Sequence, residues 1–356
     1  MKHSILHLTP AFNYADGRSY YIYLLLKYFK LRGHEVYLCT DKGDSFDRIE
    51  ELGIRIFAFP ELSAKTSFLK SVKFVSEIVA QNRINIIHTH HRYQELLSNS
   101  MPKNSNVHTV FTALSIVDKR FFVEYKSEKI IAVSNSVKEM LIKKFNIDEN
   151  KISLIPNFVD SEEESGSKLK PGSNRNSLEE NKQVIILSIG RFHKEKNYET
   201  LLKAIVLLKD LNLKLILVGE GEEKKSYEKI IKENSLNVKF FPPQRNLKEF
   251  FDISDICILT SLRDPFPGFM LQSGLNKKPF IGSNVDGISE LIKDGVNGLL
   301  FEKENEHALA EKIELFNGNT ILAAKCAETL NELVLEKYTQ KTVVPCIEEL
   351  YNNLLR

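Results

Sequence analysis

The chain has 356 residues, 42% of them hydrophobic and 27% charged, with a formal net charge of +2. This balance is typical of a globular protein and excludes an intrinsically disordered chain. The length predicts two domains of roughly 160–180 residues each.

The amino-terminal residues predict a cytoplasmic protein. Ile5–Leu8 is a strand-length apolar run rather than the core of a signal peptide. The longest aliphatic and aromatic stretch, 20–29, is broken by Lys27 and is too short to span a membrane. The four cysteines form no CxxC pair, as expected of reduced thiols.

The charge is unevenly divided along the chain. Residues 1–160 hold 22 Lys and Arg against 17 Asp and Glu, a net charge of +5. A basic first half favours an anionic acceptor or a membrane surface. An ordinary solvated surface is the alternative for so small an excess.

The first half alternates apolar runs with amphipathic patterns, which is typical of parallel α/β sheets. Strands are predicted at Ile5–Leu8, Glu35–Thr40, Arg55–Phe59, Ile84–His88, Val107–Phe111, Lys129–Val133 and Lys151–Ile155. Helices are predicted at Ser19–Leu31, Ser67–Ala80 and Ser136–Phe145.

Residues 161–182 are predicted to be a linker, because they contain no aromatic residue and only two leucines. The α/β pattern then resumes. Strands are predicted at Val184–Ile189, Lys214–Val218, Val238–Phe241, Ile256–Leu259 and Pro279–Ile281. Helices are predicted at Tyr198–Leu208, His307–Phe316, Ile321–Lys337 and Thr342–Leu355.

Two cations follow the predicted strand Val184–Ile189, at the kind of position where parallel sheets bind ligands. They lie in the segment 190–197, GRFHKEKN. Arg191 offers a planar fork for phosphate oxygens, and Lys196 offers a compact charge. Together they could neutralise a diphosphate; an ordinary basic loop is the alternative.

A second loop, TSLRDPFPGFMLQ at 260–272, follows the strand Ile256–Leu259. Its prolines and glycine delay helix formation, which places Asp264 in the loop and Gln272 on the next helix. The N–H groups of Gly268, Phe269 and Met270 would then point at a ligand. The alternative is that Asp264 only caps the helix.

Together with 152–160 (ISLIPNFVD) and 284–298 (NVDGISELIKDGVNG), these loops resemble family 4 of the retaining GT-B glycosyltransferases in order and spacing. The resemblance is strongest in 183–300, and in the first half it includes 32–36 (RGHEV) and 131–134 (IAVS).

The resemblance implies an α/β fold of two Rossmann-like parallel-sheet domains facing across a cleft. Residues 1–160 would bind the acceptor, 161–182 would link the domains, and 183–340 would bind the nucleotide sugar. A carboxyl-terminal helix in 341–356 would return to the first domain.

Individual roles are also implied by the resemblance. The family's arginine and lysine that hold the donor diphosphate fall on Arg191 and Lys196. Its two glutamates, which contact the transferred sugar and the ribose, fall on Asp264 and Gln272. Asp264 keeps the charge on a shorter arm, and Gln272 loses the charge but can still bond a hydroxyl. Arg191, Lys196 and Asp264 are therefore the expected catalytic residues.

Donor-binding residues are expected at Gly17, Gly190, Gly268, Phe269, Met270 and Gln272. The family's glycine-rich phosphate loop is reduced here to DGRS at 16–19, in which Gly17 allows close backbone approach and Arg18 adds a cation. A histidine that the family often has is absent from FTAL at 111–114.

Three histidines cluster in 87–93, IHTHHRY. Alternation along a strand sends His88 and His90 to one side and His91 to the other. A metal site is one interpretation, but no carboxylate or cysteine nearby completes it. We predict instead that His90 and His91 line the acceptor pocket, with a packing and capping role as the alternative.

The implied activity is hexosyl transfer with retention from a nucleotide-diphosphate donor, with a UDP-sugar favoured. The acceptor would be a glycan or a lipid-linked glycan, as in bacterial surface polysaccharide or lipopolysaccharide synthesis. No carboxylate stands out as a nucleophile, so we favour a front-face route. In this route Arg191, Lys196 and the helix N-terminus near Gly268 stabilise the departing diphosphate.

No metal, cofactor or nucleic-acid partner is therefore expected, and peripheral contact with the inner membrane surface is left open. Two rivals remain. One is a catalytically degenerate GT-B protein that binds a nucleotide sugar, which the departures at Gln272 and in the glycine-rich loop favour. The other is a non-hydrolysing nucleotide-sugar epimerase.

Overall fold

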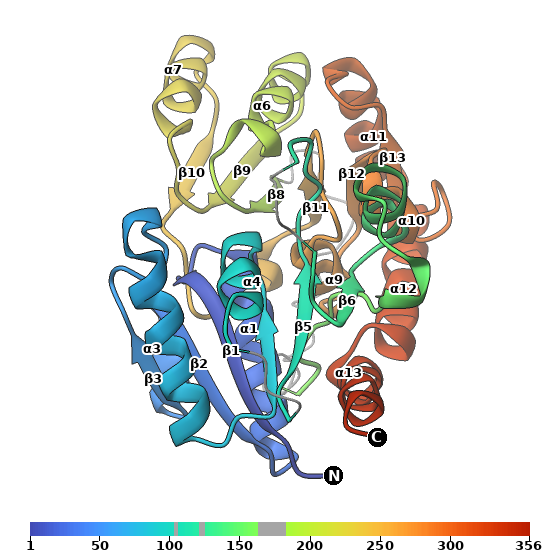
Figure 1. Cartoon of the computed structure of the whole chain (residues 1–356). Coiled ribbons are helices and arrows are strands. Elements are labelled where there is room, and N and C mark those ends of the chain that lie inside the picture. The colour runs from blue at the N-terminus through green and yellow to red at the C-terminus, as the bar shows by residue number, and fades with distance from the viewer. Residues whose placement is uncertain (103–105, 121–124, 163–182) are drawn as a thin grey trace. The chain divides into compact units, whose positions relative to one another are not determined.

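The computed structural model describes residues 1–102, 106–120, 125–162 and 183–356 (Figure 1). The chain divides into two compact units. Unit 1 consists of Met1–Asn157 and Gln340–Arg356, and unit 2 of Phe158–Thr339. Most of the predicted linker, residues 163–182, lies outside the described residues.

Unit 1 is built on a parallel sheet of seven strands in the order β3-β2-β1-β4-β5-β6-β7. The strands are β1 Ser4–Phe12, β2 Glu35–Gly43, β3 Arg55–Ala58, β4 Ile86–Thr89, β5 His108–Ala113, β6 Lys129–Ala132 and β7 Ile152–Leu154. The helices are α1 Gly17–Leu31, α2 Asp47–Glu50, α3 Phe68–Gln81, α4 Arg92–Asn99, α5 Asn135–Glu139 and α13 Gln340–Leu354.

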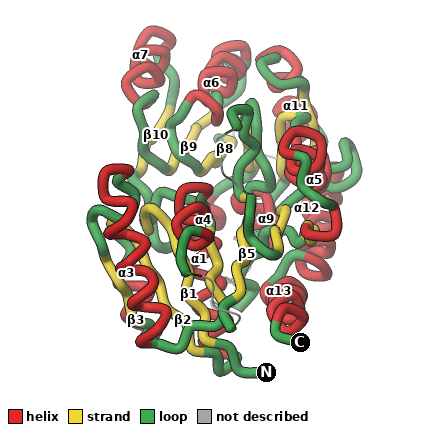
Figure 2. The backbone as a smooth tube through the Cα atoms, viewed as in Figure 1, coloured by secondary structure: helices red, strands yellow, loops and turns green. Residues whose placement is uncertain are grey.

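Both faces of the unit 1 sheet are covered by helices (Figures 1 and 2). On one face, Leu6 of β1 shares a core cluster with Val75 of α3 and Leu97 of α4. On the other face, Tyr351 of α13 stacks on Phe29 of α1. Burial on both faces explains why the strands are short, nearly continuous apolar runs.

Unit 2 repeats this plan with a parallel sheet of six strands in the order β10-β9-β8-β11-β12-β13. The strands are β8 Val184–Ile189, β9 Leu213–Val218, β10 Val238–Phe241, β11 Ile256–Leu259, β12 Phe280–Ser283 and β13 Leu299–Phe301. The helices are α6 Tyr198–Leu207, α7 Lys224–Asn234, α8 Lys248–Ile253, α9 Gly268–Leu275, α10 Asp286–Leu291, α11 Glu306–Gly318 and α12 Thr320–Lys337.

Each unit is therefore a Rossmann-like α/β domain, as the sequence predicts. The bounds of β8, β10 and β11 are those predicted from their apolar runs. The sequence prediction missed short or polar elements, among them α4, α7, α8, α10 and β13. Across the described residues, no helix combines the length and apolar character that crossing a membrane requires.

The last helix, α13, packs on the rest of unit 1 partly through polar contacts. Glu348 accepts hydrogen bonds from Arg32, and its other carboxylate oxygen lies 3.0 Å from His34 Nε2. The Tyr351 hydroxyl lies 2.6 Å from His88 Nδ1, and both residues are fully buried. These contacts link residues that are more than 260 positions apart in the chain.

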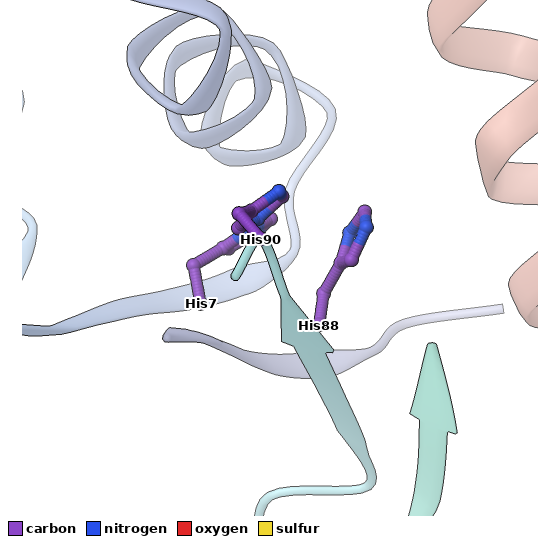
Figure 3. A group of neighbouring side chains, drawn as sticks. All are labelled: His7, His88 and His90. Atoms are coloured by element: carbon purple, nitrogen blue, oxygen red, sulfur yellow. The ribbon is translucent and has the colours of Figure 1, made fainter. Parts of the chain in front are cut away.

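Three histidines lie in the core of unit 1, where β1 and β4 pair (Figure 3). His7, His88 and His90 are each at most 2% exposed. His7 Nδ1 and His90 Nε2 are 2.9 Å apart, and His88 Nε2 lies 2.6 Å from the Thr112 hydroxyl. Burial lowers the pKa of all three imidazoles, that of His7 to about 3.

The same three histidines are the group among the described residues that could hold a metal ion, with one ligand nitrogen from each within 4.8 Å of the others. Both ring nitrogens of His88 are already hydrogen-bonded, to Tyr351 and Thr112. A dication would have to displace one of these bonds. Since the group contains no carboxylate, the buried charge would also stay uncompensated. We therefore describe the group as a core of neutral imidazoles.

Unit 1 should lose stability as the pH falls from 6.5 to 5. In the folded chain these histidines and His91, whose pKa burial lowers to about 4, stay neutral. In the unfolded chain they protonate near pH 6.5. The unfolded state therefore gains protons that the folded state does not. The free energy of unfolding should fall by up to about 1.4 kcal/mol for each pH unit and each histidine. Urea unfolding from pH 7.5 to 5 measures this slope.

Two variants test whether the buried histidines cause this dependence of stability on pH. His91→Asn keeps a helix-capping acceptor but removes one lowered pKa, so its stability should depend less steeply on pH. His307→Asn, at an exposed position of α11, should keep the full slope. A urea midpoint that does not change between pH 7.5 and 5 would show that the buried histidines do not oppose protonation.

Candidate functional site

The main group of predicted site residues lies where the strand order of unit 2 reverses, between β8 and β11. These strands are parallel neighbours, with Ile186 opposite Ile256. Their carboxyl ends therefore meet at one edge of the sheet, the usual ligand position in this fold. The loop 190–197 follows β8, and the loop 260–267 follows β11.

Lys196 and Asp264 form an ion pair at this edge. Lys196 Nζ lies 2.5 Å from Asp264 Oδ2, and the two side chains are 23% and 7% exposed. The Ser261 hydroxyl donates to the same carboxylate oxygen at 3.2 Å. Two residues 68 positions apart are thus brought together in a position that solvent reaches only from the lysine side.

The two loops are tied together through their backbones. The Thr260 hydroxyl donates to the carbonyl of Lys196 at 2.9 Å, and the Leu262 amide donates to the carbonyl of Glu195 at 2.7 Å. These bonds fix the direction in which Lys196 leaves the backbone. The ion pair with Asp264 then locates the ammonium.

The segment at the start of α10 holds Asp264 from the other side. Asp286 Oδ2 accepts the Asp264 amide at 3.1 Å, and the Gly287 amide donates to the Asp264 carbonyl at 3.0 Å. A Cβ on Gly287 would lie 1.9 Å from the carbonyl oxygen of Pro265, so this approach requires glycine. Burial raises the pKa of Asp286.

Asp264 does not cap α9, because the residue at the cap position is Pro267. No side chain of the described residues caps this helix, so the amides of its first turn, at Gly268, Phe269 and Met270, are available to a ligand. A Cβ on Gly268 would meet nothing within 4 Å, which leaves open space at the helix start. Gln272 lies one turn further on and is 7% exposed.

Arg191 is exposed, and it forms no ion pair with any other described residue. Gly190 precedes it, and a Cβ there would lie 3.0 Å from the Tyr198 hydroxyl and 3.8 Å from Lys196 Cε. Glycine at this position therefore leaves room for the Tyr198 hydroxyl. Arg191, Lys196 and the start of α9 together offer two cations and a row of amides.

The remaining predicted residues belong to unit 1. Gly17 opens α1 and is exposed, and a Cβ on it would meet no described atom within 4 Å. His91 is the N-cap of α4, and its Nδ1 accepts the Tyr93 amide at 3.3 Å. His90 pairs with His7. His91 thus has the capping role that the sequence left as an alternative, and His90 has the packing role.

Both histidines also line a cavity of about 690 Å³ in unit 1. The cavity lies beyond the carboxyl ends of β1, β4 and β5, next to the point where the strand order of this sheet reverses. Arg18 at the start of α1 and Arg92 at the start of α4 contribute to its lining. His90 and His91 thus both line this cavity, and acceptor binding there stays a prediction.

Sequence reasoning assigned no role to Thr260, Ser261 and Asp286, which hold the Lys196–Asp264 pair in place. All three lie inside or next to the motifs that carry the resemblance. The available signal was the polar side chains of Thr260 and Ser261 directly after β11, and that of Asp286 three positions after β12.

Two family models match the chain. "Glycosyltransferase Family 4" matches residues 15–163, and "Glycosyl transferases group 1" matches residues 172–332. Together they account for most of the chain, and they divide it at nearly the same position as the two sheets do.

Relatives with assigned activities support the same family. The chain is 24% identical over 329 residues to the UDP-Gal:alpha-D-GlcNAc-diphosphoundecaprenol alpha-1,3-galactosyltransferase of Escherichia coli, covering 83% of each chain. It is 23% identical over 356 residues to the N-acetyl-alpha-D-glucosaminyl L-malate synthase of Bacillus anthracis, covering 91% of each.

Solved structures share the fold. A glycosyltransferase from Rickettsia africae superposes with a TM-score of 0.84 at 23% identity, covering 100% of this chain and 99% of that one. HepE from Anabaena, in complex with UDP and glucose, gives 0.83 at 18% identity, covering 98% and 99%. With two Rossmann-like domains and both family models matched, the chain belongs to the family 4, or group 1, glycosyltransferases with a GT-B fold.

Proposed function

We propose that this glycosyltransferase is a retaining, metal-independent hexosyltransferase that uses a UDP-sugar donor. The observation that carries the proposal is the Lys196–Asp264 pair at the strand-order reversal of unit 2, beside Arg191 and the uncapped start of α9. Two cations and a row of amides match the charge and geometry of a diphosphate. Structures of similar proteins with UDP support this choice of nucleotide.

In this proposal the donor diphosphate lies against Arg191, Lys196 and the amides of Gly268, Phe269 and Met270. The side-chain amide of Gln272 bonds a ribose hydroxyl. Asp264 contacts a hydroxyl of the transferred sugar, and its carboxylate keeps the Lys196 ammonium directed at the phosphates. Preorganised charges of this kind stabilise the transition state without reorganising during the reaction.

The proposed chemical step takes place on one face of the sugar. The bond between the anomeric carbon and the diphosphate oxygen breaks first, which leaves a sugar with oxocarbenium character and a diphosphate with additional negative charge. The acceptor hydroxyl then forms its bond to the anomeric carbon on the same face. Its proton passes to the departing diphosphate oxygen, so no protein nucleophile is consumed.

The domain roles follow from where these groups lie. We assign nucleotide-sugar binding to the second Rossmann-like domain and acceptor binding to the first, with His90 and His91 at the acceptor cavity. The names of similar proteins from Escherichia coli and Staphylococcus aureus support an acceptor from bacterial surface polysaccharide synthesis. A cytoplasmic location, with or without peripheral contact at the inner membrane surface, fits a nucleotide-sugar donor.

The first prediction is that a UDP-sugar raises the melting temperature of the protein in the presence of EDTA. At a ligand concentration of 100 times Kd the stabilisation should be about 2.7 kcal/mol. UDP-glucose, UDP-galactose and UDP-N-acetylglucosamine should act more strongly than GDP-mannose. Stabilisation that disappears with EDTA would contradict the metal-independent site.

The second prediction concerns the diphosphate. Arg191→Ala and Lys196→Ala should each lower kcat by roughly 10²–10³, because the charge on the diphosphate grows as the bond breaks. The two effects should be less than additive, since both cations serve one group. Lys194→Ala, at an exposed position of the same loop, is the matched control and should keep normal turnover.

Melting curves of each variant show whether the fold is intact, which matters most for Lys196→Ala because it leaves Asp264 without its ammonium partner. Sugar transfer or slow donor hydrolysis, followed by release of UDP, provides the rate. Near-normal turnover in a folded Arg191→Ala or Lys196→Ala variant would place the leaving group elsewhere. Nuclear magnetic resonance of the product then shows whether the anomeric configuration is retained.

The third prediction concerns the ribose. Gln272→Glu should keep or raise donor affinity, because a carboxylate is a stronger acceptor for hydroxyl groups than an amide. Calorimetric titration with UDP measures the change, and Asn276→Asp, one turn further along the chain, serves as the control for added charge. If Gln272→Glu abolished UDP binding in a folded protein, Gln272 would not contact the ribose as proposed.

A further inference from the structure

The unit 1 cavity has an unbalanced charge. Among the residues that line its 690 Å³ are Arg18, Lys65 and Arg92, and none of the described lining residues is an aspartate or a glutamate. Three cations around a cavity without a carboxylate repel one another unless an anion enters. The cavity therefore favours a ligand that carries negative charge.

Arg18 is the cation most available to such a ligand. Its side chain is half-buried, and its Nε is buried without a hydrogen-bond partner among the described residues. His90, 2% exposed, also has an unpartnered ring nitrogen, Nδ1, and lines the same cavity. Leaving a buried polar atom unpaired is unfavourable, and a bound phosphate oxygen would accept a hydrogen bond from Arg18 Nε.

Arg92 is better compensated than Arg18. Its guanidinium donates to the carbonyl of Lys119 at 3.0 Å and lies 5.8 Å from the ring centroid of Tyr125. The buried carboxylate of Glu95 also acts on it, although Glu95 itself is bonded by the amides of Tyr125 and Ser127. Arg92 therefore shapes the wall of the cavity, and Arg18 and Lys65 supply its free positive charge.

Two helices begin beside the cavity. Arg18 lies in the first turn of α1, which contains no acidic residue, and Arg92 opens α4. The nearest carboxylate at the start of α1 is Asp16, which caps the helix by accepting the Arg18 amide at 3.2 Å. Glu95 likewise lies in the first turn of α4, so a carboxylate offsets each helix dipole and the side-chain cations carry most of the positive potential.

Most of the remaining wall is apolar. Phe68, Tyr93, Phe111, Leu114, Val117 and Tyr125 line the cavity. A small inorganic anion would leave this surface in contact with water, which is unfavourable by about 25 cal/mol for each Å². The wall therefore fits a ligand whose anionic group is attached to an apolar body.

We propose that this cavity binds the sugar acceptor through a phosphate group on Arg18, with an apolar portion of the same molecule along the aromatic wall. A phosphate matches the planar fork of the arginine and the charge of several cations. The proposal rests on the proposed function only in naming the ligand as the acceptor. Phosphate binding itself can be measured without any donor or turnover.

The test measures binding of decyl phosphate, decyl glucoside and glucose 1-phosphate to the full chain by calorimetric titration, below the micelle concentrations. Decyl phosphate should bind more tightly than the neutral decyl glucoside. Arg18→Gln should weaken decyl phosphate binding about 10- to 100-fold, the range expected for a lost charge-assisted hydrogen bond of about 1.5–3 kcal/mol. Arg55→Gln, at an exposed position on β3 outside the cavity, should leave it unchanged.

Arg191→Ala, a variant of the unit 2 site outside this cavity, should bind decyl phosphate as tightly as the unmodified chain, so failure of the donor site and failure of this cavity give different results. Glucose 1-phosphate that binds as tightly as decyl phosphate, and loses affinity in Arg18→Gln, would overturn the apolar part of the proposal and assign the phosphate site to a soluble sugar phosphate. Equal binding of decyl phosphate and decyl glucoside would overturn the proposal. So would equal losses in Arg18→Gln and Arg55→Gln.

Discussion

The parallel pairing of neighbouring strands at the reversal of strand order is the constraint on which both candidate sites depend. Because β8 and β11 run in the same direction in fixed register, the loops that follow them must leave the sheet at one edge. The same holds for β1 and β4 in the other domain. The sheet thus brings together side chains that lie far apart in the sequence, and the loops only orient them.

The two sites use this edge in different ways. In unit 2, Lys196 and Asp264 are already paired. The Thr260 hydroxyl donates to the Lys196 carbonyl and the Asp286 carboxylate accepts the Asp264 amide, and these bonds hold the pair. In unit 1, Arg18 lines a cavity to which no described carboxylate contributes, and the positive charge is left uncompensated at a largely apolar wall. Because Asp264 already holds the Lys196 ammonium, that site can direct the cation at one group of its ligand. The uncompensated positive charge in unit 1 instead favours any ligand that carries negative charge.

The sequence predicts the fold and the strand exits because continuous apolar runs such as Val184–Ile189 have one plausible role in an α/β chain. It does not predict α4, since this helix has only two turns and buries Gln94 and Glu95 instead of an apolar stripe. Nor does it predict the contact between Lys196 and Asp264, which depends on strand order. Motif spacing identifies Lys196 and Asp264 as separate site residues, but it does not show that they form an ion pair.

The return of α13 to the first domain has a consequence for biosynthesis. Unit 2 is one continuous segment, but unit 1 needs both the first residues and the last ones of the chain. During synthesis from the amino terminus, the buried His88 must wait for Tyr351 to leave the ribosome before its hydrogen bond can form. The second domain can therefore finish folding first, although domains usually complete in the order in which they are made. A chain cut short near its carboxyl terminus would expose the core of its amino-terminal domain.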